Sequence, residues 1–344
     1  MSKVTIVLPI YNVEQYLTKC FESILNQSFK EYKVLSINDG STDNSLDIIN
    51  EYVARYPKLI KNINKVNGGY GSVLEYAFKQ IDTEYTLICD PDDYLEQNAL
   101  LNLYNEAHKS EADIVIGAKV IVYNDSDEKK EDISYNKKYV ELKDGHIYQR
   151  DKELYNDLFF VDPSPHSKLY RTSIIKSINF PKKTSFTDNL LYFVSLLKAE
   201  KVVYIRKFCS FYLIDRTGNT MTNIKPKVIL DHVLVFSTII ECSKKFKQLP
   251  PVFYYRMFES YKYIFREIKR INCSDSEKRK LAKELYLLVE LLKPYKKEVE
   301  YYYNFYDFYD VNEKKKDLML FGPLSKSIYS RNVNKLLASI KVTK

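Results

Sequence analysis

Three carboxylates stand close together in the segment LICDPDDYL, where Asp90, Asp92 and Asp93 follow an apolar run. Negative charges this close repel one another unless a cation or a cationic group neutralises them. Hard oxygen ligands suit Mg²⁺ or Mn²⁺, which proteins commonly hold through one or two carboxylates together with substrate phosphates. The segment therefore predicts a divalent-metal site for a phosphate-containing substrate. Taken alone, it equally fits a helix N-terminus with favourable acidic residues.

A second acidic segment, SINDGSTDNS, begins at the end of another apolar run. A carboxylate at a strand end, such as Asp39, can accept hydrogen bonds from a nucleobase edge or a ribose. Gly40 permits a tight turn, and Ser41, Thr42 or Asp43 can cap a following helix. A capped turn explains residues 40–43 by themselves, but the two acidic segments together indicate a nucleotide site.

The elements that must position these residues alternate along the chain between short apolar runs and amphipathic stretches. This alternation predicts a mostly parallel sheet with helices on both faces, and ligands bind such sheets at the carboxyl ends of the strands. The runs expected as strands are VTIVLPI, YKVLSIN, a weaker run at residues 60–66, YTLICD and ADIVIGA, and helices are expected near residues 16–25, 46–53, 72–80 and 97–108. The polar residues that follow the first four expected strands are Asn12, Asp39, Asn67 and Asp90.

The second half of the chain divides into three stretches. Residues 124–151 are polar and charged, which predicts a loop or an exposed hairpin. Mixed structure follows, with short strands expected at residues 202–205 and 210–214, and from residue 226 apolar residues recur at helical spacing. We expect an α/β domain over residues 1–225, with halves of about 1–118 and 119–225, and an all-helical region of two to four helices over 226–344.

Charge and cysteine content narrow the class of protein. The net charge is +8, but residues 227–344 hold 24 Lys/Arg against 14 Asp/Glu, so the basic character lies in the helical region. The five cysteines are odd in number and scattered, which favours a reducing cytoplasm. No stretch approaches the roughly 20 apolar residues of a membrane span. The four histidines have no metal-ligand spacing, and no Ser/His/Asp or Cys/His arrangement has local support.

The motifs occur in an order that resembles a known family. The opening VTIVLPIYN, the turn DGSTD, the segment NGGYG and the segment DPDD have the order and approximate spacing of family 2 glycosyltransferases. The chain resembles that family over about residues 1–215, which implies the GT-A fold, a Rossmann-like mixed sheet with helices on both faces. It also implies that the half over 1–118 binds a nucleotide sugar and the half over 119–225 binds an acceptor.

The resemblance assigns roles at the nucleotide site. It implies a UDP-sugar donor, with Pro9, Tyr11 and Asp39 around the uridine and Asp90 near the ribose. Asp92 would hold the Mn²⁺ or Mg²⁺ that bridges the diphosphate. The remaining residues implied to line the nucleotide pocket are Asn67 and the adjacent Gly68, since small residues permit close backbone approach.

The acceptor half carries a partly matching block. PSPHSKLYR is similar to the W-(N/D)-K-L-(Y/F) segment of bacterial surface-polysaccharide members, but His166 replaces the tryptophan and the chain has no tryptophan at all. Lys168 in this block is either a surface charge or a substrate residue. In PKKTSFTDNLLYF, Asp188 stands where the family has its catalytic base, and Thr187 stands where glutamate is commoner; the alternative is a plain helix start.

The last motif is YLIDRTGNTMT at residues 212–222, which is similar to an element that closes over the diphosphate in related enzymes. Arg216 would then stabilise the departing UDP, because a guanidinium forms paired hydrogen bonds to phosphate oxygens. An ordinary surface loop is the competing interpretation.

The resemblance implies an inverting transfer of a Glc, Gal or GlcNAc type sugar. The acceptor would be a hydroxyl of a capsule, teichoic-acid or other surface glycan, often lipid-linked. The reaction would take place at the cytoplasmic side of a cell envelope. Two other classes are a non-catalytic UDP-sugar-binding or scaffold protein and a nucleotidyltransferase, for which no Lys- and Gly-rich loop is present. The basic, Tyr-rich helical region suits an anionic membrane, a phosphate-containing acceptor or homo-oligomer packing. Nucleic acid is not an expected partner, because no nucleic-acid module is recognisable.

Overall fold

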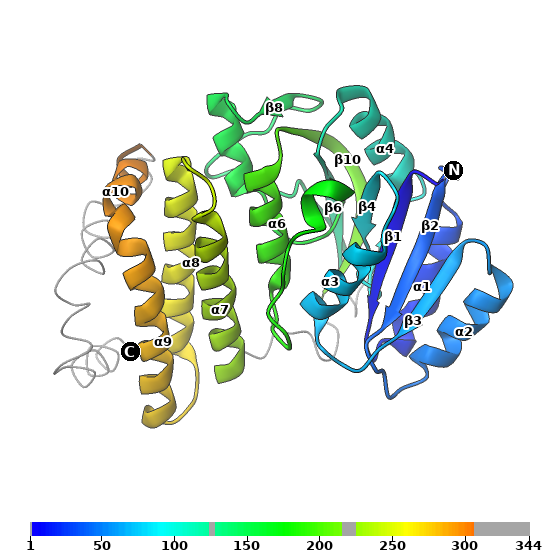
Figure 1. Cartoon of the computed structure of the whole chain (residues 1–344), viewed down its shortest axis with the longest axis horizontal. Coiled ribbons are helices and arrows are strands. Elements are labelled where there is room, and N and C mark those ends of the chain that lie inside the picture. Colours follow the sequence, from blue (N-terminus) through cyan, green and yellow to red (C-terminus); the bar gives the residue numbers. More distant parts are fainter. Residues whose placement is uncertain (1, 124–127, 215–224, 306–344) are drawn as a thin grey trace. The chain divides into compact units, whose positions relative to one another are not determined.

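A ten-stranded mixed sheet organises the N-terminal part of the chain (Figure 1). The computed structural model of the protein describes residues 2–123, 128–214 and 225–305. The main path of the sheet runs β3-β2-β1-β4-β9-β6-β10-β5, with β7 paired to β6 and β8 to β10. The strands are β1 (Val4–Ile10), β2 (Tyr32–Asn38), β3 (Ile60–Asn64), β4 (Tyr85–Ile88), β5 (Tyr94–Leu95), β6 (Ile114–Tyr123), β7 (Lys129–Asp132), β8 (Ile147–Gln149), β9 (Lys168–Arg171) and β10 (Lys201–Ile214).

Strand direction changes in the middle of the sheet. β3, β2, β1 and β4 are mutually parallel, as the sequence pattern predicts. β9 then runs antiparallel to both of its neighbours, β4 and β6, and β10 runs parallel to β6. In register, Ile10 lies beside Asn38 and Asn38 beside Asn64, so the first three strands end side by side.

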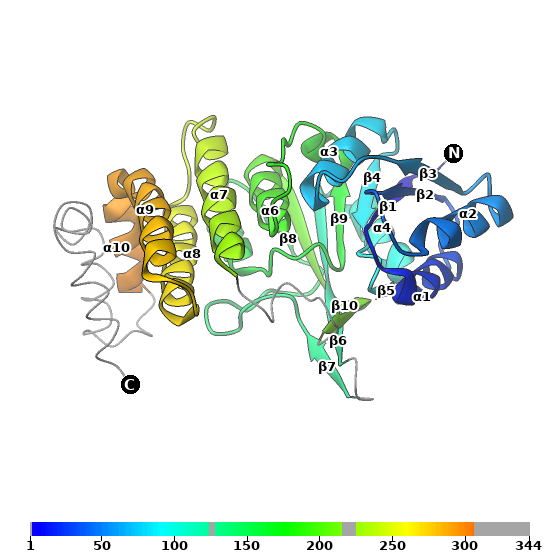
Figure 2. The same ribbon diagram turned by 90° about the horizontal axis from the view of Figure 1, so that it is seen from below.

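Helices cover both faces of this sheet. α1 (Glu14–Leu25), α2 (Ser45–Arg55) and α4 (Ala99–Ser110) pack on one face, where Val4, Ile6, Leu8 and Ile10 of β1 are completely buried. α3 (Tyr70–Gln80) and α6 (Thr187–Lys198) lie on the other face (Figure 2). Successive side chains of a strand point to opposite faces, so a strand covered on both sides is apolar throughout. This explains the unbroken run VTIVLPI.

Two features predicted for residues 119–225 take a different form. The polar stretch after β6 contains β7, which pairs antiparallel with β6, and β8, which pairs with β10. The two short strands expected near residues 202–205 and 210–214 are one strand, β10. Its register shifts between Ile205 and Phe208 and again between Phe208 and Ser210, and such irregularities bend a strand locally. The short helices η1 (Glu153–Phe160) and α5 (Thr172–Ile175) complete this part.

The chain forms two compact units, residues 1–219 and 220–344. The described part of the second unit is helical, as the apolar spacing predicts: α7 (Pro226–Ser243), α8 (Pro251–Arg270), α9 (Asp275–Leu292), η2 (Lys293–Tyr295) and α10 (Lys296–Phe305). A proline opens α7 and α8, where its missing N–H costs nothing. α9 begins with a reciprocal capping box between Ser274 and Glu277. Within the described residues, every helix is too short or too polar to cross a membrane.

Candidate active site

Asp39 ties together the ends of the first strands. It follows β2, its backbone N–H donates to Ile10 O at 2.8 Å, and its side chain is almost fully buried. Lys65 Nζ donates to Asp39 Oδ1 at 2.5 Å, and the Gly68 and Gly69 N–H groups donate to the carboxylate at 3.0 and 2.8 Å. A carboxylate that receives several donors orders the loop that supplies them. Asp39 therefore fixes the glycine loop at residues 67–69 beside the end of β1.

The turn after β1 is held by the turn after β2. Asn12 has a left-handed backbone (φ 51°), and its side-chain oxygen accepts from Thr42 N at 2.8 Å. Ser41 Oγ accepts from Asn12 N at 3.1 Å. Tyr11 is half exposed, whereas Pro9 is buried in β1. The structure thus gathers the predicted uridine residues and the predicted pocket residues Asn67 and Gly68 at one edge of the sheet, where Tyr11 presents an aromatic ring to solvent.

The glycines of NGGYG lie against the chain that carries Asp188. Gly69 has φ 83°, and a Cβ there would stand 2.9 Å from Lys183 Cα. A Cβ on Gly71 would stand 2.7 Å from Phe180 Cβ and 3.1 Å from Thr187 Cγ2. The backbone adds a direct link, because Lys183 N donates to Gly68 O at 2.7 Å. These glycines therefore permit close approach of two protein segments, in addition to their predicted role beside the nucleotide.

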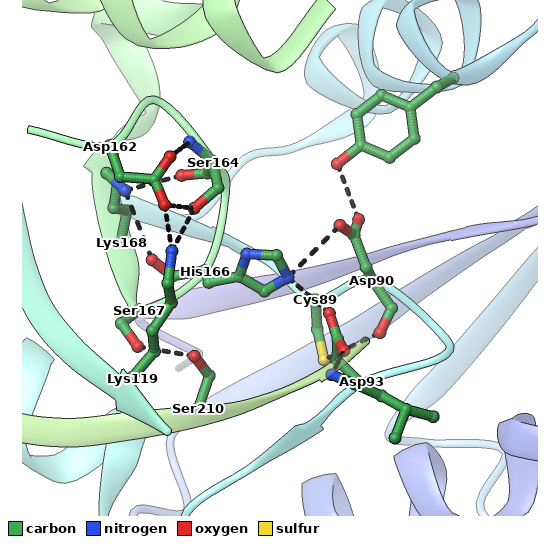
Figure 3. A network of polar contacts seen from close by, with 12 residues as sticks. Cys89, Asp90, Asp93, Lys119, Asp162, Ser164, His166, Ser167, Lys168 and Ser210 are labelled. Carbon is green, nitrogen blue, oxygen red and sulfur yellow. Dashed lines mark hydrogen bonds and ion pairs between the residues drawn. The ribbon is translucent and has the colours of Figure 1, made fainter. Parts of the chain in front are cut away.

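Asp90, Asp93 and His166 form the centre of the site (Figure 3). His166 Nε2 lies 2.5 Å from Asp93 Oδ2 and 3.7 Å from Asp90 Oδ2. The histidine and Asp93 are buried, whereas about a fifth of the Asp90 side chain is exposed. Two carboxylate oxygens and one imidazole nitrogen that converge in this way are a donor set that fits a divalent cation. Among the His, Cys, Asp and Glu side chains of the described residues, these three form the group whose potential ligand atoms all lie within 4.8 Å of one another.

The oxygens of these carboxylates that face away from His166 have other partners. Tyr70 Oη donates to Asp90 Oδ1 at 2.8 Å, and Leu213 N of β10 donates to Asp93 Oδ1 at 2.7 Å. The His166 ring also packs on Tyr212, with ring centroids 4.4 Å apart. Outer partners of this kind fix the orientation of ligating side chains. Because Tyr70 opens α3 directly after the glycine loop, it connects the acidic cluster with the Asp39 region.

Burial and like charge shape the titration of this cluster. Burial, together with Asp92 and Asp93, raises the pKa of Asp90 to about 7 against the opposing effect of His166. Burial lowers the pKa of His166, but the charges of Asp93 and Asp90 outweigh it, and the pKa is raised. Protonation of His166 and ionisation of Asp90 therefore favour each other.

A second buried network lies next to the first (Figure 3). Lys119 of β6 pairs with Asp162 and donates to Ser164 Oγ at 3.2 Å, and its side chain is 2% exposed. Lys168 of β9 is fully buried and donates to Ser164 O at 2.6 Å. Burial lowers the pKa of Lys168 to about 7, and despite burial the two lysines hold the pKa of Asp162 well below its usual range. Burial excludes the surface-charge interpretation of Lys168.

Asp188 lies in the first turn of α6, on the chain that packs against Gly71. Burial raises the pKa of Asp188 to about 6, and the negative charge of Asp162 adds to the rise. Its carboxylate also interacts electrostatically with Tyr70, His166 and Lys168. Asp188 therefore shares an electrostatic environment with the acidic cluster, and a carboxyl with a raised pKa suits a general base near neutral pH.

Two predicted residues stand apart from this geometry. Asp92 lies between Asp90 and Asp93 in the turn that Asp93 N closes on Asp90 O at 3.0 Å, and it is partly exposed. It is not one of the three clustered ligands, and its predicted role on the metal stays a prediction. Arg216, with the lid element around it, lies outside the described residues.

Sequence reasoning missed His166 as a partner of the acidic segment. The two segments are more than seventy positions apart, and the only signal was a histidine where relatives carry tryptophan. Tyr70, Lys119 and Asp162 were also missed. A tyrosine directly after two glycines and a lysine inside an apolar strand are the signals that would have pointed to Tyr70 and Lys119.

Comparison with known proteins supplies an independent view. The family model described as glycosyl transferase family 2 matches residues 5–178. A poly(ribitol-phosphate) beta-glucosyltransferase of Bacillus spizizenii is 31% identical over 226 residues, which cover 64% of this chain and 33% of that protein. Glycosyltransferase GlyA of Streptococcus pneumoniae is 30% identical over 220 residues, 62% of this chain and 31% of that protein. The chain spans about a third of the length of these relatives.

Solved structures share the fold. Staphylococcus aureus TarS 1-349 in complex with UDP-GlcNAc superposes with a TM-score of 0.70 at 19% identity, over 96% of this chain and 93% of that one. A mannosyltransferase of Pyrobaculum calidifontis in complex with GDP-Man and Mn²⁺ gives a TM-score of 0.51 at 12% identity, over 96% and 88% of the two chains. The predicted α/β fold class with a helical C-terminal region is confirmed.

Proposed function

The chain belongs to glycosyl transferase family 2, and from this premise we propose that it transfers a sugar from a UDP-sugar to a hydroxyl of a teichoic-acid or related surface-glycan acceptor, with inversion. The observation that carries the proposal is the arrangement of Asp39, Asp90 and Asp188 around one edge of the sheet. Asp39 and Asp90 follow strands β2 and β4, and Asp188 has the electrostatic environment of a base. This arrangement supports a nucleotide-binding edge with a proton acceptor beside it.

The donor would bind at the strand ends. Tyr11 has an exposed ring that would stack on the uracil, and Pro9 would line the pocket beside it. Asp39 holds the loop of Asn67 and Gly68 in place. Asp90, on which Tyr70 is anchored, would receive the ribose. Arg216 would pair with the departing diphosphate, because its guanidinium matches the geometry of phosphate oxygens.

A divalent ion at the acidic segment, Mn²⁺ or Mg²⁺, would neutralise the charge that develops on the leaving diphosphate. Its predicted carboxylate ligand is Asp92, and the convergent oxygens of Asp90 and Asp93 supply further donors. Asp188 would take the proton from the acceptor hydroxyl while the hydroxyl oxygen attacks the anomeric carbon. This role requires Asp188 to be unprotonated. A single displacement of this kind converts an α-linked donor into a β-linked product.

The donor and acceptor classes rest on the relatives. A relative acts on poly(ribitol phosphate), and a structural neighbour binds UDP-GlcNAc. A glucose, galactose or N-acetylglucosamine donor and a polyol-phosphate or lipid-linked acceptor are therefore the substrates to test. The basic helices from residue 226 would hold an anionic acceptor or the inner face of an anionic membrane, where each Lys or Arg near the surface contributes about 1 kcal/mol. Self-association through these helices is the alternative.

The experiment measures UDP release from a panel of UDP-sugars with Mn²⁺ and an acceptor hydroxyl, for the wild type and for Asp188→Asn. The variant keeps the size of the side chain but removes the base, and we expect turnover to fall by about 100- to 10,000-fold while UDP affinity stays unchanged. Asp157→Asn, another partly buried carboxyl with a raised pKa, is the matched control and should retain activity. Equal turnover by wild type and Asp188→Asn would remove Asp188 from the mechanism, and no release by the wild type with any donor would refute the activity.

A further inference from the structure

The acidic cluster contains a nitrogen donor that the motif DPDD does not supply. His166 comes from the loop before β9, and its Nε2 points between the Oδ2 atoms of Asp90 and Asp93 (Figure 3). We propose that His166 is a direct ligand of the divalent ion at this site, together with Asp90 and Asp93, and that it makes the site prefer Mn²⁺ over Mg²⁺. The inference deepens the proposed function, because it concerns the same metal site, and it assigns the inner oxygen of Asp90 to the ion in place of the ribose.

The outer contacts of the cluster support ligation. Each carboxylate has one oxygen occupied by a partner from another element, Tyr70 Oη for Asp90 and Leu213 N for Asp93. The remaining oxygen of each faces His166 Nε2. Outer hydrogen bonds of this kind orient the ligands of protein metal sites; here they hold the two carboxylates, whereas His166 Nδ1 is buried without a hydrogen-bond partner and its ring is held by packing on Tyr212. An ion pair made only for stability does not require this division of the oxygens.

The distances fit a cation after a small adjustment. Neighbouring ligands of an octahedral ion are about 3.0 Å apart when each lies about 2.1 Å from the metal. The Nε2 distances to the two oxygens are 2.5 and 3.7 Å, which bracket that value. Asp93 and His166 would separate by about half an ångström to admit the ion. The exposed fifth of Asp90 leaves one side of the cluster accessible, as an ion that also holds a diphosphate requires.

The nitrogen donor determines which ion is favoured. Mg²⁺ prefers oxygen ligands and near-ideal octahedral geometry, whereas imidazole is a good ligand for first-row transition ions. A site of two carboxylates and one imidazole therefore binds Mn²⁺ more strongly relative to Mg²⁺ than a site of carboxylates alone. Loss of the imidazole should remove that preference and leave a weaker, less selective carboxylate site.

Mn²⁺ alone is the probe, because its unpaired electrons couple to a directly bound nitrogen nucleus. We expect electron spin echo modulation from ¹⁴N in the wild-type protein with Mn²⁺. The chain has four histidines, so protein that contains ¹⁵N-histidine tests the ligand without any mutation: the ¹⁴N modulation should be replaced by ¹⁵N coupling. In His166→Gln the nitrogen modulation should disappear. Mn²⁺ affinity should fall by at least the roughly 10- to 100-fold that loss of an outer partner of a metal ligand costs, with a much smaller change for Mg²⁺. His146→Gln, which alters a partly exposed histidine next to β8, is the control and should behave like the wild type.

Several results would overturn the inference. The wild-type protein could fail to bind Mn²⁺, or it could bind Mn²⁺ without nitrogen coupling. The third such result is nitrogen coupling that persists in His166→Gln. If His166→Gln does not fold, the ¹⁵N-histidine coupling is measured in His108→Gln, His146→Gln and His232→Gln: its retention in all three assigns the ligand to His166, and its loss in one of them overturns the inference. None of these measurements requires turnover, so a nitrogen-bound Mn²⁺ in a protein that releases no UDP would retain the inference and refute the proposed function.

Discussion

Substitution of Gly71 by alanine tests whether the glycine segment positions the base. The added Cβ would lie 2.7 Å from Phe180 Cβ and 3.1 Å from both Thr187 Cγ2 and Thr187 Oγ1. Non-bonded carbon atoms prefer a separation of about 3.5–4.0 Å, so the segment that precedes α6 must retreat by about 0.8 Å or more. Thr187 immediately precedes Asp188, and the retreat therefore moves the carboxylate.

The energetic and catalytic effects of Gly71→Ala have different sizes. Overpacking costs about 1–3 kcal/mol, and alanine in place of glycine within a helix recovers up to about 1 kcal/mol, so the net loss of stability is about 0–3 kcal/mol. A misplacement of about 1 Å can reduce turnover about 100-fold. We expect kcat to fall about 10- to 100-fold, while UDP affinity changes little because the Gly68 and Gly69 donors to Asp39 remain.

The assay combines UDP release kinetics, calorimetric titration with UDP and urea unfolding. Gly145→Ala is the control, because Gly145 has a φ of +68° and the added Cβ meets no atom within 4 Å. This variant introduces backbone strain of about 1–2 kcal/mol without crowding near the base. It should retain the wild-type kcat. A wild-type kcat in Gly71→Ala would refute the positioning argument. A parallel loss of UDP affinity and kcat would instead assign Gly71 to the nucleotide pocket.

Two further predictions follow from buried charges. UDP release should rise with pH through a midpoint near 6, because burial raises the pKa of Asp188 to about 6 and only the carboxylate accepts a proton. Asp162→Asn should move this midpoint to lower pH, because the charge of Asp162 also raises the pKa of Asp188. An unchanged pH profile in the variant would contradict this. Burial lowers the pKa of Lys168 to about 7 from 10.5, so the unfolded chain binds more protons between these values and the free energy of unfolding should increase with pH across this window. Urea unfolding should show a smaller increase for Lys168→Met, and parallel curves for the two proteins would exclude this contribution.

The strand and helix order of residues 1–118 was predictable because it follows from local periodicity. Unbroken apolar runs such as residues 4–10 belong to strands covered on both faces, and polar residues follow where those strands end. The position of Asp39 at the end of β2 and that of Asp90 after β4 followed from this rule. The family resemblance was carried by the same residues, and the family model and the shared fold confirm it.

The long-range pairing of the acceptor half was not predictable in this way. β9 has four residues and lies between β4 and β6, neither of which adjoins it in sequence. No local pattern specifies such an insertion, so the contact of His166 with Asp93 was not foreseen. Lys119 and Lys168 were equally hidden, because a lysine inside a strand normally indicates an exposed face. Here the neighbouring carboxylate of Asp162 pairs with Lys119 and offsets part of the cost of burying Lys168.

The position of β9 limits how this protein can be recombined with its relatives. A chimera joined after residue 118 would take the predicted nucleotide half from one parent and the predicted acceptor half from another. The second parent would then supply the strand that pairs with β4 and the histidine that contacts the acidic turn. Exchange of residues 119–225 would thus also change the strand pairing of β4 and the charge beside Asp93, unless residues 161–171 were returned to the first parent. Residues 1–118 and 119–225 are separate in sequence, but they cannot be exchanged between relatives as independent modules.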